Sequence, residues 1–416
     1  MRVLFVSHFI PHPPTGGASL RNFNIVKELS RNNSVHLVTF TQRDRHPTRE
    51  RIEKSREVLK EFCEEITIID VPSDGSSLRW YSLLGLNMFS REPYSAWRFW
   101  SPMMAQAIED QIAKHKFDIV HVDTIALAGY LKNLKGLPAV LNHHNVESTL
   151  LLRRAATEKN PATRAYIGLQ GRKLRSAEQR ALSAFDGNIS VSDLDGQELS
   201  ELNPKATICV VPNGTDTEFF KPIDGVDEDL SLVFAGSMAW YPNGDAMILF
   251  GEKIWPLIKR ELPDIQMNLI GSRAPAEVVK LGQVDNQFKV LGFVDDVRPT
   301  IARAAVYVVP IRVGGGTRLK ILDAMAMGKA IVSHPIGAEG LDVTDGKDIV
   351  IAEEPELFAK RVVELVRDVE SRQLISAQAR KSVVEKYSWS TIIPKMEQFY
   401  QEIAKRKREK SNKNNA

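Results

Sequence analysis

Two series of short apolar runs, separated by helix-like segments, constrain the fold of this chain most strongly. The runs are rich in Val, Ile and Leu, as is typical of parallel strands buried on both faces of a sheet. In the first half they occupy 3–7, 35–40, 66–71, 118–123, 139–144 and 187–192, with helical patterns at 20–31, 48–64 and 149–185. In the second half they occupy 230–236, 265–271, 288–294, 304–310 and 329–335, with helical patterns at 243–260, 296–303, 316–327 and 354–368. This alternation predicts βαβ units and a doubly wound sheet in each half.

The two halves meet at residues 208–220, ICVVPNGTDTEFF, where Pro212, Asn213 and Gly214 form a strong turn signal after a strand. A chain of 416 residues is too long for one ordinary hydrophobic core. We therefore predict an α/β protein with two Rossmann-like domains, at 1–210 and 211–387. Such sheets bind ligands at the carboxyl ends of their strands, so the expected active site is a cleft between two domains that face each other.

Composition excludes several other classes of protein. Hydrophobic residues make up 43% and charged residues 26%, and the net charge of +3 does not indicate a nucleic-acid binder. The two cysteines, Cys63 and Cys209, argue against a disulfide framework or a cysteine metal site. The opening MRVLFVSHFI is too short for a signal peptide and is typical of a buried strand, and no run reaches the roughly 20 apolar residues that span a bilayer. We expect a cytoplasmic protein.

Residues 314–328, GGGTRLKILDAMAMG, indicate an anion-binding site. A glycine turn that opens a helix presents unpaired backbone N–H groups and the positive end of the helix dipole. Arg318 and Lys320 would strengthen that site, or could lie on a solvated helix face. Asp323 could accept a hydrogen bond from a ribose hydroxyl, or pair with Lys320. The pattern suits the diphosphate and ribose of an activated sugar.

Residues near other strand ends suggest further parts of a site. Gly16 and Gly17 lie between the first strand and a helix, where they could form a tight turn or let the backbone approach a phosphate. Arg21, one helical turn later, could reach an anion or be an exposed structural residue. His8 ends the first strand and faces the expected cleft.

The loop after the first strand of the second half holds another group. Asn243 follows Pro242 at an expected helix start, where it could be an N-cap or a ligand residue. Ser237 and Trp240 lie in the same loop.

Seven segments, in order, resemble those of GT-B glycosyltransferases of the retaining superfamily that includes glycogen synthase. They are PTGGASLR (14–21), HHNVES (143–148), VVPNGTDTEFF (210–220), FAGSMAWYPNGDA (234–246), LGFVDDVRP (291–299), the glycine motif from 314 onward and YSW (387–389). The resemblance covers nearly the whole chain. It implies an N-terminal acceptor domain, a C-terminal nucleotide-sugar donor domain and a last helix, at 388–410, that returns to the first domain.

The resemblance also implies roles for individual residues. HHNVES is similar to the segment with the active-site histidine, which implies a catalytic role for His144. Without the resemblance, His144 would be interpreted as a polar residue that caps a strand end, and His143, on the opposite face, is the alternative if the register differs by one. The backbone of Val294, in LGFVDDVRP, would hold the base.

Two departures from the superfamily pattern concern the charge of the donor site. The superfamily commonly carries two glutamates eight positions apart, and here Asp323 occupies the second position and Gly315 the first. The usual Arg and Lys pair is absent from GSMAWYPN. We infer that Arg318 and Lys320 carry the diphosphate charge instead. The backbone N–H groups that could assist them are those of Gly315, Gly316 and Thr317.

The predicted activity is transfer of a hexosyl group from a UDP- or GDP-sugar to an acceptor hydroxyl, with retention of anomeric configuration. Arg318, Lys320 and a helix N-terminus at 316–318 would stabilise the leaving diphosphate, and His144 would orient the donor sugar. We expect no obligatory metal and no other cofactor.

Three alternatives come from other classes. The first is an epimerase acting on the nucleotide sugar, for which Glu147 is the nearby candidate base. A second is a non-catalytic binding scaffold, because Gly315 lacks the usual carboxylate. A nicotinamide dehydrogenase is disfavoured, since no GxGxxG follows an expected strand.

The segment 77–100 stands apart, with three Trp, two Tyr and two Phe among basic residues. This mixture is typical of a surface that meets an anionic membrane or a lipid-tailed acceptor, or of a hydrophobic hairpin packed on the first domain. The basic tail at 404–416 is expected to be a frayed helix end with weak attraction to phospholipid heads. We expect a glycan or lipid-linked acceptor in surface polysaccharide or glycolipid synthesis, a place at the inner face of the membrane, and no nucleic-acid partner.

Overall fold

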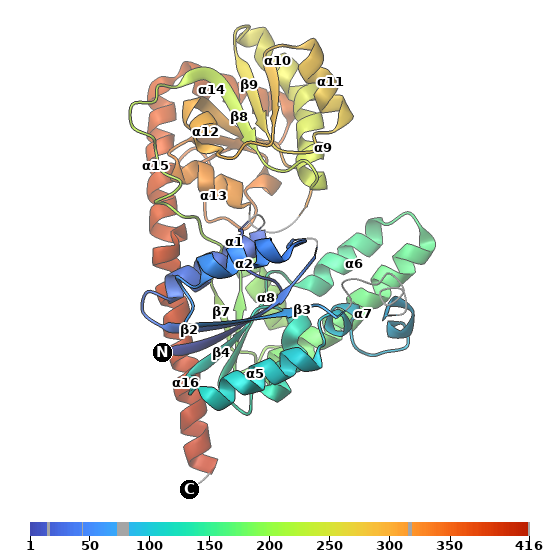
Figure 1. Cartoon of the computed structure of the whole chain (residues 1–416). Coiled ribbons are helices and arrows are strands. Elements are labelled where there is room, and N and C mark those ends of the chain that lie inside the picture. Colours follow the sequence, from blue (N-terminus) through green and yellow to red (C-terminus); the bar gives the residue numbers. More distant parts are fainter. Residues whose placement is uncertain (15–16, 44, 73–82, 315–317, 415–416) are drawn as a thin grey trace. The chain divides into compact units, whose positions relative to one another are not determined.

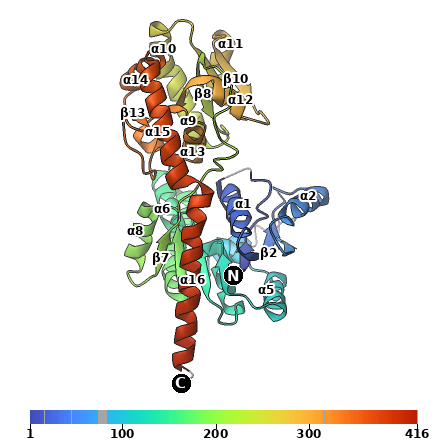
Figure 2. The same cartoon turned by 90° about the vertical axis from the view of Figure 1, so that its left-hand side faces the viewer.

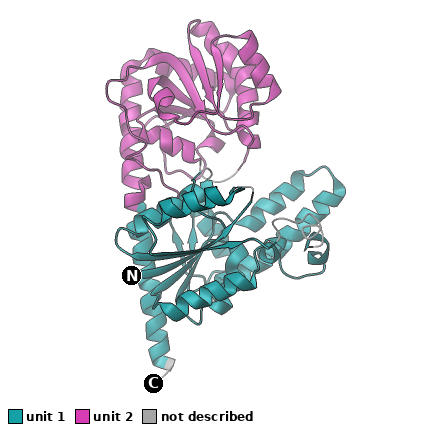
Figure 3. Ribbon diagram, viewed as in Figure 1, with its two compact units in different colours: residues 1–212, 392–416 teal, residues 213–391 magenta. Residues whose placement is uncertain are grey.

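The computed structural model of the chain describes residues 1–14, 17–43, 45–72, 83–314 and 318–414. The chain forms two compact units (Figure 3). Unit 1 consists of Met1–Pro212 and Ile392–Ala416, and unit 2 of Asn213–Thr391. The division at Pro212 and Asn213 falls within the turn-forming stretch at 208–220.

Unit 1 is built on a sheet of seven parallel strands in the order β3-β2-β1-β4-β5-β6-β7. The strands are β1 (Arg2–Ser7), β2 (Ser34–Thr41), β3 (Glu65–Asp70), β4 (Ile119–Val122), β5 (Ala139–Asn142), β6 (Gly187–Ser190) and β7 (Ile208–Val210). The chain adds strands on one side of β1 and then on the other, so the order reverses between β1 and β4. Residues that follow β1 and β4 therefore lie at the reversal point, where open α/β sheets bind ligands.

Helices cover both faces of this sheet, with α1 and α2 on one face and α5 on the other (Figure 1). They are α1 (Gly17–Leu29), α2 (Arg49–Leu59), α4 (Tyr94–Arg98), α5 (Pro102–Lys114), the 3-10 helix η1 (Ile125–Asn133), α6 (Glu147–Thr157), α7 (Pro161–Ala184) and α8 (Asp193–Leu202). The helical stretch expected at 149–185 is two helices. Pro161 begins the second one, and the Asn160 side chain caps it by accepting from the Thr163 N–H at 3.0 Å.

The last helix, α16 (Trp389–Asn414), belongs to unit 1 from Ile392 onward and lies against the unit 1 sheet (Figure 2). Tyr400 Oη lies 2.5 Å from Nδ1 of His121 in β4. A Cβ on Gly187 in β6 would lie 2.7 Å from Phe399, so this glycine permits the close approach of helix and strand.

Unit 2 is built on a sheet of six parallel strands in the order β10-β9-β8-β11-β12-β13. The strands are β8 (Asp229–Ala235), β9 (Gln266–Ile270), β10 (Phe288–Gly292), β11 (Ala304–Val309), β12 (Ala330–Ser333) and β13 (Val350–Ile351). The helices are α9 (Tyr241–Leu249), the π-helix η2 (Phe250–Ile254), α10 (Trp255–Glu261), α11 (Ala276–Val284), α12 (Arg298–Arg303), α13 (Leu319–Ala326), the 3-10 helix η3 (Pro335–Gly337), α14 (Pro355–Arg367) and α15 (Val369–Tyr387). The two-residue strand β13 is too short to give a periodic sequence signal.

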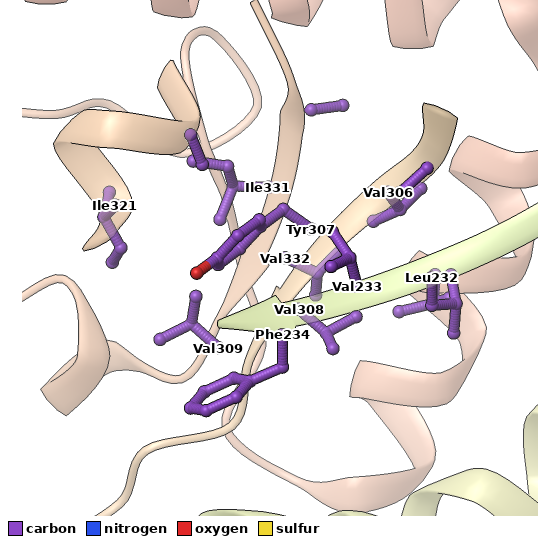
Figure 4. Close-up of a cluster of buried hydrophobic side chains, with 14 of the residues drawn as sticks. Leu232, Val233, Phe234, Val306, Tyr307, Val308, Val309, Ile321, Ile331 and Val332 are labelled. Carbon is purple, nitrogen blue, oxygen red and sulfur yellow. The ribbon is translucent and has the colours of Figure 1, made fainter. Parts of the chain in front are cut away.

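The core of unit 2 holds the end of β8 in place (Figure 4). Tyr307, from β11, packs among Phe234, Val233 and Ile331. Its buried hydroxyl donates to the Ala235 carbonyl at 3.2 Å and accepts from the Ala235 N–H at 3.1 Å. The loop after β8 therefore starts from an anchored position. The prediction of an α/β fold with two doubly wound parallel sheets is confirmed.

Candidate functional site

In unit 1, the ends of three neighbouring strands bring together two histidines and an aspartate. His8 lies just after β1, Asp123 directly follows β4, and His144 lies just after β5. Because β4 lies between β1 and β5, these three residues meet at one edge of the sheet.

Asp123 is the centre of this group. Its Oδ2 lies 2.8 Å from Nδ1 of His8, and its Oδ1 lies 2.8 Å from Nε2 of His144. The aspartate side chain is fully buried, whereas those of His8 and His144 are 19% and 14% exposed. Burial alone would raise the pKa of Asp123, but the charges and hydrogen bonds of His144 and His8 hold it well below its ordinary value. Asp123 is therefore an ionised carboxylate that orients two imidazoles.

The bond to Asp123 determines what His144 can offer a ligand. With Nε2–H donated to the carboxylate, a neutral ring leaves Nδ1 as a hydrogen-bond acceptor. The centroid of the His8 ring lies 6.2 Å from that of His144. Asp123 contacts this ring through Nδ1, so Nε2 of His8 is the nitrogen that could contact a ligand. Sequence analysis named both histidines but missed Asp123. A signal existed, because a carboxylate lies at the carboxyl end of the predicted strand at 118–123.

His143 lies on the other face of the strand end. Its Nε2 lies 3.1 Å from Oδ1 of Asn188, and burial lowers the pKa of His143 to about 4. Adjacent residues alternate in direction as expected, so His144 is the one that contacts Asp123. The strand itself ends at Asn142, earlier than the expected 144.

Arg21 is buried rather than exposed. Its guanidinium donates to Oδ1 of Asn142 at 3.1 Å and to the carbonyl of Pro212 at 3.0 Å. Burial lowers the pKa of Arg21 to about 10. The interpretation of Arg21 as an exposed residue is wrong, because it ties α1 to the end of β5 and to Pro212. Gly17 is the exposed first residue of α1, and Gly16 lies outside the described residues.

Unit 1 also contains two largely apolar cavities, of about 590 and 520 Å³. Trp97, Trp100 and Lys132 are among the residues that line the larger one. The smaller one is lined by Tyr166 and by Glu147, whose Oε1 accepts from Oγ1 of Thr124 at 3.0 Å. Within the described part of 77–100 the chain is helical at 83–87 and in α4, and residues 77–82 lie outside the described residues.

In unit 2, the glycine motif leads into α13. The helix begins at Leu319, with Arg318 as its N-cap residue, which is later than the expected 316. Gly314 has a φ of +105°, and a Cβ there would lie 3.0 Å from Cγ of Pro242, so both backbone and space require glycine. Of the expected ligands, Gly315, Gly316 and Thr317 lie outside the described residues.

Lys320 lies in a nonpolar and weakly hydrated setting. Its Nζ donates to Oδ1 of Asn243 at 2.6 Å and lies 4.2 Å from the centroid of the Phe234 ring. Loss of hydration lowers the pKa of Lys320 to about 7, and the neighbouring Arg318 charge acts in the same direction. The Lys320 residue as a whole is partly exposed.

The loop after β8 shapes this setting. Helix α9 begins at Tyr241 with Trp240 as its N-cap residue, so the interpretation of Asn243 as an N-cap is wrong. Instead, Nδ2 of Asn243 donates to the Ser237 carbonyl at 2.7 Å, and the amide links that loop to Lys320. A Cβ on Gly236 would collide with the Lys320 ammonium and lie 2.8 Å from Nδ2 of Asn243. Glycine at 236 thus leaves room for the ammonium.

Arg318 and Asp323 complete the group. The guanidinium carbon of Arg318 lies 4.9 Å from the centroid of the Trp240 ring, and burial lowers the pKa of Arg318. Oδ1 of Asp323 accepts from Oγ1 of Thr215 at 2.6 Å, and burial raises the pKa of Asp323 to about 7. Asp323 thus hydrogen-bonds to Thr215, and Lys320 hydrogen-bonds to Asn243. These bonds do not form the Asp323–Lys320 pair that was the alternative interpretation.

Two further candidates are placed without a distinctive contact. Val294 is partly buried against the core of unit 2. Ser237 has an exposed side chain, and its carbonyl accepts from Asn243.

Family models match both units. The model described as glycosyltransferase family 4 matches residues 15–219, and the model described as glycosyl transferases group 1 matches residues 229–368.

Curated proteins resemble the chain at low identity. An uncharacterized 44.6 kDa protein in the cps region of Klebsiella pneumoniae is 25% identical over 170 residues, which are 38% of this chain and 42% of that protein. The phosphatidyl-myo-inositol mannosyltransferase of Mycobacterium tuberculosis is 23% identical over 322 residues, which are 73% of this chain and 78% of the relative.

Solved structures share the fold along nearly the whole chain. Sucrose-phosphate synthase from Thermosynechococcus elongatus superposes with a TM-score of 0.68 at 15% identity, covering 97% of this chain and 99% of that one. Anabaena HepE in complex with UDP and glucose superposes with a TM-score of 0.65 at 16% identity, covering 97% and 100%.

Proposed function

Because the chain belongs to the GT-B glycosyltransferases, with a family 4 domain followed by a group 1 domain, we propose that it transfers a hexosyl group from a nucleotide diphosphate sugar to an acceptor hydroxyl with retention of configuration. Unit 2 binds the donor and unit 1 the acceptor. The donor nucleotide is UDP or GDP, and the similarity to HepE, whose structure holds UDP and glucose, favours UDP.

The setting of Lys320 carries the proposal. Its ammonium is partly desolvated against an amide and an aromatic ring, and its pKa falls to about 7. A diphosphate would return the charge stabilisation that water otherwise provides, and this gain grows as negative charge develops on the leaving group. Arg318, beside Lys320 at the start of α13, adds a planar donor suited to phosphate oxygens.

In unit 1, His144 acts on the sugar rather than as a covalent nucleophile. Asp123 orients the ring through Nε2, so Nδ1 accepts from a sugar hydroxyl. His8, held by the same carboxylate, is the second group that contacts substrate. Asp123 is a positioning residue, and Asp323 binds the ribose in exchange for its bond to Thr215.

The acceptor is a glycan or a lipid-linked glycan used in surface polysaccharide or glycolipid synthesis. Two observations support a lipid-linked one: the similarity to a phosphatidyl-myo-inositol mannosyltransferase, and the apolar cavities of unit 1. Exposed apolar side chains of unit 1, Leu86, Met88, Phe89 and Met103, suit peripheral contact with an anionic membrane at its cytoplasmic face. Within the described ranges, no helix has the length and apolar character needed to cross a membrane.

An epimerase remains the alternative that needs a base, and Glu147 is its candidate. Transfer to an acceptor releases free nucleotide, so the amount released depends on the acceptor concentration. Epimerisation leaves the nucleotide attached to the sugar and shows no such dependence. Oε1 of Glu147 already accepts a hydrogen bond from Thr124, so this oxygen is engaged within unit 1.

The test begins with thermal shifts against UDP-, GDP- and ADP-sugars, since a bound donor stabilises the folded chain by mass action. Nucleotide release is then measured with and without lipid-linked acceptors. We expect stabilisation by one nucleotide class, acceptor-dependent release, and loss of release in His144→Ala. Release that does not depend on the acceptor, or that survives in His144→Ala, would contradict the proposal.

A further inference from the structure

A second cluster of histidine and carboxylate groups lies in unit 1, away from Asp123. It consists of His36 in β2, Glu65 at the start of β3, and His115, which follows α5. Each offers one ligand atom, and the three atoms lie within 4.8 Å of one another. Nε2 of His115 lies 3.1 Å from Oε2 of Glu65, and the two imidazole centroids are 4.4 Å apart.

This cluster is separate from the candidate transfer site. His36 pairs with Leu4 in the sheet, four positions before His8. At about 3.3 Å per residue, this places the cluster about 13 Å along the strands from His8, toward their amino ends.

The side chain of Gln111, in α5, orients two of the three groups. Its Oε1 lies 3.1 Å from Nδ1 of His36, and its amide also hydrogen-bonds to Glu65. Because the amide oxygen accepts from His36 Nδ1–H, the amide NH₂ is the part that donates to Glu65. A second layer of this kind, which fixes the tautomer of a histidine and the direction of a carboxylate, is what metal sites use.

The other ring nitrogen of His36 also lies beside a carboxylate. His36 is 1% exposed, and its Nε2 faces a second carboxylate. Oε2 of Glu64 lies 3.3 Å from this nitrogen. A cation held here would be attracted by both carboxylates, and the imidazole nitrogens could coordinate it.

The charges nearby are compatible with a bound cation. Lys114 is the adjacent base, and its Nζ lies 3.3 Å from Oε1 of Glu65, with its side chain 61% exposed. Lys114 contacts Oε1 of Glu65, whereas Oε2 of Glu65 faces His115 and is the oxygen that would coordinate a cation. A metal at this position would take the place of the hydrogen bond between His115 and Glu65.

We propose that His36, Glu65 and His115 bind one Zn²⁺ ion. Two imidazoles and one carboxylate are donors that zinc accepts, and water or Glu64 completes the coordination. The ligands come from β2, β3 and the end of α5, so the ion fastens this helix to the edge of the sheet. It takes no part in sugar transfer.

The site is tested on tag-free protein that has been stripped with chelator and dialysed against micromolar ZnCl₂. We expect one bound zinc per chain by mass spectrometry, and a higher Tm than for the stripped protein. His115→Ala and Glu65→Gln change partly exposed residues, and each should weaken zinc binding at least about 100-fold. Gln111→Leu, which removes only the orienting amide, should weaken it about 10–100-fold.

His12→Ala is the matched control, because it removes a partly buried histidine of the same unit that contacts Ser55 instead of the cluster. Zinc binding in this variant should equal that of the parent. Co²⁺ in place of Zn²⁺ should give strong visible absorption from low coordination, which His115→Ala abolishes. Absence of zinc binding by the parent, or equal binding by the His115→Ala and parent proteins, would overturn the proposal.

Discussion

Unit 1 and unit 2 treat the charges of their candidate sites in opposite ways. In unit 1, the buried Asp123 carboxylate is bonded on both oxygens to imidazoles, and its pKa is lowered. In unit 2, Lys320 is bonded to a neutral amide and lies over an aromatic ring, and its pKa is lowered because hydration is lost. The charge of Asp123 is stabilised by groups of the fold itself. The charge of Lys320 would be stabilised most by an anionic ligand.

This difference separates two contributions to catalysis. A group satisfied by the fold is preorganised, and changing it should affect the rate more than donor binding. A desolvated cation contributes its energy when an anion binds, so changing it should affect donor affinity as well. Variants in the two units should therefore separate in their effects on kcat and KM.

The largest effect is expected in unit 1, from Asp123→Asn. The amide keeps the shape of the carboxylate, but it cannot accept from both histidines and stabilise their charged or correctly oriented forms. The transfer kcat should fall about 100-fold or more, with little change in donor affinity. Steady-state kinetics give kcat, and the donor-induced thermal shift gives affinity.

Asp70→Asn is the matched control, because Asp70 is an exposed carboxylate at the carboxyl end of β3 in the same sheet. Its kcat should remain that of the parent. An Asp123→Asn protein that keeps its kcat, or loses donor affinity to the same extent, would break the distinction between the units.

In unit 2, Arg318→Ala should act mainly on the donor. Loss of a charge-assisted contact to the diphosphate should raise the donor KM about 10–100-fold. Arg312→Ala is the control, since Arg312 lies in the same loop but is paired with Asp245 at 2.8 Å. Donor affinity that is unchanged by Arg318→Ala, or equally reduced by Arg312→Ala, would exclude the assigned role.

The fold could be predicted well from the sequence because parallel strands buried on both faces leave nearly continuous apolar runs. The run VLFVS, for example, lies within β1. The boundary at 158–160 within the long helical stretch was missed, although Pro161 and Asn160 carry the signal. The strand β13 has two residues, and its pairing with β12 is a tertiary effect that no local pattern shows.

The candidate sites were predicted less completely. Sequence analysis identified His144 and His8 as site residues because histidines follow expected strand ends. It interpreted Asp123 only as the last residue of a strand. Its importance depends on the strand order, which puts β4 between β1 and β5. Arg21 was misjudged for a similar reason, because its partners Asn142 and Pro212 are distant in sequence and only the fold brings them together.

The pH dependence of donor binding should sharpen the view of unit 2. The pKa of Lys320 is lowered to about 7 without ligand, and a bound diphosphate raises it. Above about pH 7 binding must therefore include proton uptake, so donor affinity should fall by up to about tenfold per pH unit. Calorimetry between pH 6 and 9 measures this slope, and it should disappear in Lys320→Met, which binds weakly throughout. An equal slope in both proteins would assign the titration to another group.

A smaller change in the same unit is Gly236→Ala. The added Cβ would collide with the Lys320 ammonium and crowd Asn243, so the ammonium must move. We expect donor affinity to fall about tenfold, roughly the worth of one displaced charge contact. Gly129→Ala is the control, because a Cβ at Gly129 meets nothing within 4 Å. Full donor affinity in Gly236→Ala would show that the position of the ammonium does not matter.

The smallest effect is expected from His143→Asn. His143 is buried against Asn188 on the face away from Asp123, and its pKa of about 4 keeps it neutral at neutral pH. Loss of that hydrogen bond should cost about 1 kcal/mol of stability, seen as a lower Tm. The transfer kcat should change less than about threefold, whereas His144→Asn should lower it about 100-fold. If the two histidines exchanged these results, the site would lie on the opposite face of β5, and the satisfied carboxylate of unit 1 would be structural.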